Sequence, residues 1–115
     1  MKICFSSNKV EKICNDRKAA LKHLPTPKHA DKLFQRLQEL ASCSRLVDIP
    51  TSPPLRRHKL SGKLKDFWAV DLVNKHDGWR ICFLPVDYEK APDGSIDFET
   101  IVSICIERIT DHYNG

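Results

Sequence analysis

Apolar residues recur at spacings of three and four in the first part of the chain, a pattern typical of amphipathic helices. A short apolar strand is expected at 2–6, followed by a helical stripe over 10–24. The polar pair Asn15 and Asp16 is a candidate break in this helix, and Pro25 ends it because proline cannot continue the backbone hydrogen bonding.

A second apolar stripe predicts the clearest helix of the chain, at 27–41. Thr26 is suited to cap it, because a threonine hydroxyl accepts a hydrogen bond from a free backbone N–H of the first turn. Pro27 suits the first helical position, where no backbone donor is needed. The short proline-containing turn between the two helices predicts an antiparallel helical hairpin.

The second half of the chain alternates with a period of two, as strands do. Three strands are expected, at 66–73, 79–86 and 101–109, with a tight turn at 77–78 between the first two. The expected fold is therefore α+β in the order β-α-α-β-β-β. One domain over residues 1–115 would hold an antiparallel sheet with the two-helix hairpin packed on one face.

Arg80 lies within an otherwise apolar strand, and its position predicts a functional face. If Trp79, Ile81 and Phe83 face the helices, alternation places Arg80 on the opposite side of the sheet. Burial of an unpaired guanidinium is unfavourable, so we expect that side to be open to solvent or to a ligand.

Composition is that of a folded domain without a membrane span. Hydrophobic residues make up 41% of the chain, no apolar run is long enough to cross a bilayer, and residues 1–12 lack the apolar core of a signal peptide. A cytoplasmic location is expected. The five cysteines form no C-x-x-C pair, which argues against a disulfide scaffold or a zinc knuckle and favours buried, reduced thiols.

Charge is divided unevenly along the chain. Residues 1–80 carry 17 Lys and Arg against 8 Asp and Glu, whereas residues 81–115 carry 2 against 7. A basic body of this kind suits a polyanion such as nucleic acid, although a merely soluble charged surface would show the same balance.

The densest group of cations is the basic segment, defined as residues 55–66. Its candidate RNA-binding residues are Arg56, Arg57, Lys59, Lys63 and Lys65. They could contact RNA phosphates, with a solvated surface as the alternative interpretation. His58, in the same segment, can titrate near neutral pH.

The last predicted strand runs into three polar residues, Asp111, His112 and Tyr113. A frayed polar end and half of an acid/base site both explain this composition.

Three motifs, in this order, resemble the RelE/ParE toxin superfamily, and most closely its HigB-type branch, the killer proteins of plasmid maintenance systems. They are HKLSGKLKDFWAV at 58–70, GWRICF at 78–83 and DHY at 111–113. The resemblance covers nearly the whole chain and implies a RelE-like fold. It also implies the toxin of a type II toxin–antitoxin system, an endoribonuclease that cuts mRNA in the ribosomal A site without a metal or other cofactor.

The resemblance also implies partners. They are the ribosome with its mRNA and a helix-turn-helix antitoxin of the HigA type, with operator DNA bound only through that antitoxin and no membrane involved. Two other functions within the superfamily stay open: a gyrase-poisoning toxin of the ParE type, and an inactive relative that only binds the antitoxin or co-represses the operon.

Residue by residue, the family's loop histidine matches His58, its strand arginine matches Arg80 and its C-terminal acid matches Asp111. The familiar ending Asp-Tyr-His is Asp-His-Tyr in this chain, so His112 and Tyr113 are exchanged. The two histidines are expected to divide the acid and base roles. The tyrosine would stack on a base or donate a proton, and the aspartate would orient the neighbouring imidazole or bind RNA through water.

The lysine that often precedes the loop glycine of the family is replaced by Ser61 in this chain. Lys59 and Lys63 lie on either side of it and are expected, together with Arg80, to stabilise the negative charge of the phosphorane.

Overall fold

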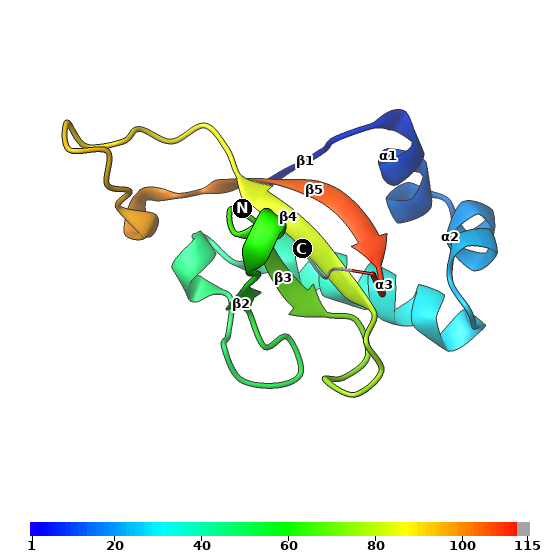
Figure 1. The fold of residues 1–115 in the computed structure, drawn as a ribbon. Helices are drawn as coiled ribbons and strands as arrows, with labels where there is room; N and C mark the ends of the chain where they lie inside the picture. Colours follow the sequence, from blue (N-terminus) through cyan, green and yellow to red (C-terminus); the bar gives the residue numbers. More distant parts are fainter. Residues whose placement is uncertain (113–115) are drawn as a thin grey trace.

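The computed structural model describes residues 1–112, which form a five-stranded sheet with three helices packed against one face (Figure 1). The strands lie in the order β1-β5-β4-β3-β2. Their bounds are β1 Lys2–Phe5, β2 His58–Lys59, β3 Trp68–Asp71, β4 Arg80–Pro85 and β5 Ser103–Thr110. The predicted α+β class is therefore confirmed.

The sheet is mixed, which corrects the prediction of an antiparallel one. β2, β3, β4 and β5 pair antiparallel, but β1 lies parallel to β5 at the edge of the sheet. Parallel pairing needs a crossover. The three helices and the strands β2, β3 and β4 all lie between β1 and β5 in the sequence. The relative direction of β1 and β5 is therefore set by how these elements pack, and no local sequence pattern reports it.

Three helices form instead of two, because the first predicted helix breaks at the polar pair. α1 (Asn8–Asn15) ends where the Asp16 N–H donates to the Lys12 carbonyl, and α2 (Arg17–His23) begins where the Asp16 carboxylate accepts from the Lys18 N–H. Asp16 has extended backbone, so one residue both ends and starts a helix. The break that the sequence indicated at this pair is confirmed.

α3 (Pro27–Ser42) is the long helix that Thr26 caps by accepting from the His29 N–H, as predicted. It lies along one face of the sheet (Figure 1). Its buried leucines, Leu33 and Leu40, meet Ile81 and Phe83 of β4 in the core, each side chain contributing roughly 1.5–3 kcal/mol of burial. No helix within residues 1–112 is long and apolar enough to span a bilayer.

The opposite face of the sheet is covered in part by the basic segment, which corrects the prediction of a free face. Leu60, Ala69 and Cys82 are buried there, and Leu64 and Phe67 pack over them. The short strand β2 forms inside the segment predicted as a loop. Its two residues are too few to show any alternation in the sequence.

A β-bulge near the end of the sheet decides which side chains share this second face. Cys82 pairs with Arg108 while Phe83 pairs with Ile106, so β5 holds one residue more than β4 at this point. Beyond the bulge, Thr110 pairs with Arg80. Because paired residues point to the same face, the end of β5 is brought beside Arg80.

Candidate active site

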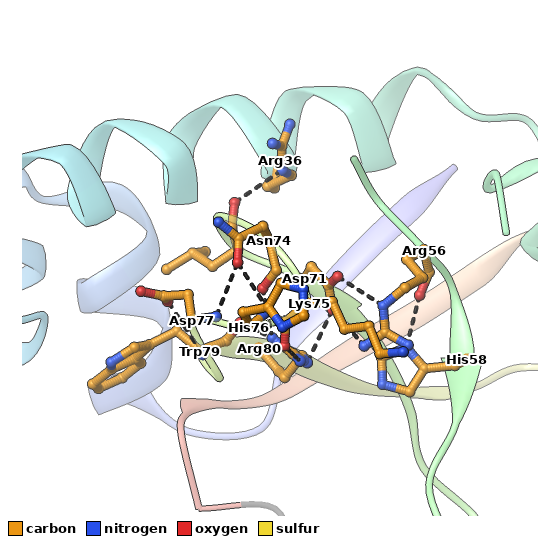
Figure 2. Close-up of polar contacts among 11 residues, drawn as sticks. Arg36, Arg56, His58, Asp71, Asn74, Lys75, His76, Asp77, Trp79 and Arg80 are labelled. Atoms are coloured by element: carbon orange, nitrogen blue, oxygen red, sulfur yellow. Dashed lines mark hydrogen bonds and ion pairs between the residues drawn. The ribbon is translucent and has the colours of Figure 1, made fainter. Parts of the chain in front are cut away.

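A buried carboxylate at the end of β3 organises the candidate site. The Asp71 side chain is 2% exposed and lies between two arginines (Figure 2). Arg56 donates from Nε and Nη2 to the two carboxylate oxygens over 2.8 and 2.9 Å. Arg80, its partner in the β3–β4 register, forms an ion pair with it, with Nε 2.9 Å from Oδ1. We call these three residues the ion-pair cluster.

Arg80 also donates three hydrogen bonds to backbone carbonyls within the fold. Nη1 donates to the carbonyls of Asn74 and Trp79 over 3.2 and 2.9 Å, and Nη2 donates to that of Lys75 over 2.8 Å. The Arg80 side chain is 3% exposed, which corrects the expectation that it stands on an open face. Burial is tolerated because Asp71 compensates the charge and backbone oxygens satisfy the donors.

His58 lies at the edge of the ion-pair cluster. Its Nδ1 is 2.7 Å from the carbonyl oxygen of Arg56. A carbonyl only accepts, so Nδ1 carries the proton and Nε2 keeps its lone pair. Burial lowers the pKa of His58, and the positive charges of Arg56 and Arg80 lower it further, against the hydrogen bond to Arg56 and the Asp71 carboxylate, which raise it. The imidazole is therefore neutral at pH 7.

Asp111 and His112 follow directly after Thr110, the residue that pairs with Arg80. The backbone N–H of His112 donates to the Thr110 hydroxyl over 2.9 Å. Its Nε2 lies 3.3 Å from the Asp111 carboxylate, and its side chain is 92% exposed. The imidazole is thus held on one side and free for a ligand on the other. Tyr113 lies outside the described residues.

Apart from Arg56, which belongs to the ion-pair cluster, the cations of the basic segment separate into two groups. Arg57 and Lys59 lie over the Trp68 ring, 5.1 and 5.6 Å from its centroid, and each donates to a backbone carbonyl. Lys63 and Lys65 are exposed. The first two brace the tryptophan; the last two, which we call the exposed lysine pair, are available to a polyanion.

An open hollow of about 610 Å³ lies beside the ion-pair cluster, bordered by Arg56, Asp71, Lys75 and His76 among others. Its volume falls within the roughly 300–1,000 Å³ of small-molecule sites. Most of its exposed lining is apolar, with Pro53, Pro54 and Val73 beside the charged residues. Among the described side chains, no three His, Cys, Asp or Glu residues come together to hold a metal ion.

Asp71 is the residue of this site that the sequence interpretation missed. The signal was present, because Asp71 and Arg80 are opposite charges in two apolar strands joined by one turn. Each would be unfavourable to bury alone, and together they predict a cross-strand ion pair. Alternation placed Arg80 on the face away from the helices, and the β3–β4 register sets Asp71 beside it on that face.

Neither a scan against protein-family models nor a search of curated proteins finds a match to this chain. The resemblance to RelE/ParE toxins therefore rests on its three motifs and on their order.

Proposed function

We propose that this chain is the toxin of a type II toxin–antitoxin system, a HigB-type endoribonuclease that cuts ribosome-bound mRNA in the A site. The observation that carries the proposal is a neutral, half-buried His58 beside the ion-pair cluster, with His112 following the residue paired to Arg80. Two imidazoles and a cationic cluster are the groups that metal-independent RNA cleavage needs.

In the proposed reaction, Nε2 of His58 takes the proton of the ribose 2′-hydroxyl. The 2′-oxygen then attacks the adjacent phosphorus, and the bond from phosphorus to the 5′-oxygen breaks. His112, oriented by Asp111, gives its proton to that leaving oxygen, and a 2′,3′-cyclic phosphate remains on the upstream fragment. General acid and base catalysis of this kind contributes about 10²–10⁴-fold for each group.

The ion-pair cluster supplies charge rather than a direct phosphate ligand. The positive charges of Arg56 and Arg80 and the negative charge of Asp71 sum to one net positive charge beside His58. This field stabilises the extra negative charge of the phosphorane. The exposed lysine pair, Lys63 and Lys65, would hold the flanking phosphates, which assigns substrate binding and charge stabilisation to different cations.

The burial of Arg80 favours a second candidate function. A side chain that makes three hydrogen bonds to backbone carbonyls and a buried ion pair is arranged as a structural residue would be. The alternative is a protein of the same superfamily without nuclease activity, either a gyrase-poisoning toxin or a component that binds a helix-turn-helix antitoxin and co-represses its operon.

Ribosome-dependent cleavage separates the two candidates. Purified protein is added to ribosomes programmed with a defined mRNA, and the 5′ ends are mapped by primer extension. We expect a cut within the A-site codon, lost in the double variant His58→Ala with His112→Ala and kept in Lys28→Ala, a surface cation on α3. The absence of a cut with folded protein, or a cut that the double variant also makes, would reject the proposed nuclease mechanism.

A further inference from the structure

Two cysteines from opposite ends of the chain are direct neighbours in the sheet. Cys4 of β1 pairs in register with Cys105 of β5. Their neighbours Ile3 and Ile104 pair in the same way and pack against the core, so alternation turns both thiols to the other face. Cys4 is exposed and Cys105 is half-buried, which corrects the prediction that the cysteines are buried.

The spacing of the two residues suits a covalent link. Neighbouring strands lie about 4.7–4.9 Å apart, and a disulfide joins Cα atoms about 4.4–6.8 Å apart. The thiols also interact in the reduced protein: burial, followed by hydrogen bonding to Cys4, raises the pKa of Cys105 to about 12. Cys4 is thus the accessible thiol and Cys105 the one held close behind it.

We propose that Cys4 and Cys105 are a redox-reactive dithiol, which a disulfide oxidant of the glutathione type closes into a cross-strand disulfide between β1 and β5. The site is independent of the proposed cleavage of RNA. Its covalent product would tie the edge strand β1 to its inner neighbour β5.

The chemistry balances in two exchanges. The Cys4 sulfur attacks oxidised glutathione and forms a mixed disulfide, and one glutathione thiol leaves. The Cys105 sulfur then attacks the Cys4 sulfur of that mixed disulfide, and the second glutathione leaves. The two thiols lose two hydrogens and two electrons, which the two released glutathione molecules carry. Conversion of Cys4 to the mixed disulfide also removes its thiol, one of the groups that raise the pKa of Cys105.

The other cysteines provide an internal comparison. Cys14 and Cys82 are buried, and burial raises the pKa values of their thiols to about 12 and about 11. Cys43 is half-buried, like Cys105, and donates to the Glu39 carbonyl over 3.4 Å. Cys43 therefore serves as the matched control: its exposure is similar, but no second cysteine is paired with it within the described sheet.

The test is peptide mapping without reduction. The folded chain is incubated with oxidised glutathione, quenched with acid, alkylated and digested with trypsin. We expect tryptic peptides 3–9 and 91–108 to appear as one disulfide-linked species, which assigns the bond because each contains a single cysteine. The linked species should vanish in Cys4→Ser and persist in Cys43→Ser.

Three results would overturn the proposal. Recovery of both cysteines as alkylated thiols would show no reaction. A glutathione adduct on Cys4 with an alkylated Cys105 would show that the second exchange fails. A linked species that forms only in urea, or only in a covalent dimer on a non-reducing gel, would show that the native register does not bring the two thiols together.

Discussion

The ion-pair cluster and the exposed lysine pair lie on the same side of the sheet and contain the same kind of charge, yet their surroundings differ. Arg80 is buried against the Asp71 carboxylate and three backbone carbonyl oxygens, whereas Lys63 and Lys65 are exposed to water. In the sequence, all three are cations close to the same motifs: Arg80 and Lys63 were predicted to stabilise the phosphorane, and Lys63 and Lys65 to contact RNA phosphates.

The difference teaches that the sign of a charge does not determine its role. A buried cation requires a fixed partner, so its removal or the removal of its partner disturbs the fold. An exposed cation is hydrated and screened by salt, so its loss affects only the polyanion that it binds. Four predictions test this division, from the largest expected effect to the smallest.

Asp71→Asn should destabilise the protein most, by about 3–5 kcal/mol, because it leaves Arg80 buried without its counter-charge. Equilibrium unfolding in urea measures the change in free energy of unfolding. Asp66→Asn, an exposed acid of the basic segment, is the matched control and should lie within about 0.5 kcal/mol of the wild type. A change below about 1 kcal/mol for Asp71→Asn would mean that water already screens the cluster.

Arg56→Ala should have a smaller effect on the same measurement, about 1.5–3 kcal/mol, because it removes two charge-assisted hydrogen bonds but leaves Asp71 paired with Arg80. Arg45→Ala removes the surface pair with Asp48 and should have a clearly smaller effect, because water and salt screen both charges. Equal effects of the two substitutions would contradict the distinction between buried and exposed pairs.

His58 should make stability sensitive to mild acid. Its pKa is lowered in the folded protein, mainly by burial, so below its ordinary value of about 6.5 the unfolded chain binds more protons than the folded one. The free energy of unfolding therefore decreases as the pH drops below about 6.5, and it keeps decreasing until the pH reaches the lowered pKa of His58 in the folded protein. The Tm advantage of the wild type over His58→Gln should shrink from about pH 7.5 to about pH 5. An advantage that grows in acid would mean that the pKa is raised.

Lys63→Ala and Lys65→Ala should leave the free energy of unfolding within about 0.5 kcal/mol of the wild type. Their effect should appear in RNA binding: each should reduce the slope of log K against log salt by about 0.7 on single-stranded RNA. Lys28→Ala, on the helical side, should leave the slope unchanged. An unchanged slope in the double lysine variant would place the RNA elsewhere on the molecule.

Much of the fold was predictable because its signals are local. Helix α3 was recognised from its stripe and from Thr26, and β3 and β4 from their alternation, since these patterns report which side of one element is buried. The break at Asp16 was likewise visible, because a residue that caps one helix and ends another acts within one turn.

The candidate site was predictable only as a set of residues. The motifs pointed to His58, Arg80 and Asp111, but Asp71 entered only when the structure paired it with both arginines. The Asp71 carboxylate allows Arg80 to be buried through a contact between two strands. No single segment of the sequence shows that this contact forms.

The sequence by itself determined the helices, the strands other than β2, the Thr26 cap and the apolar faces of the long helix and of the central strands. The tertiary structure alone decided the parallel pairing of β1 with β5, the bulge that sets Thr110 beside Arg80, and the meeting of Cys4 with Cys105. The physical reason is the sequence separation over which each interaction acts. Periodicity and capping act between residues a few positions apart, whereas register joins residues up to about a hundred positions apart and depends on how the whole core packs.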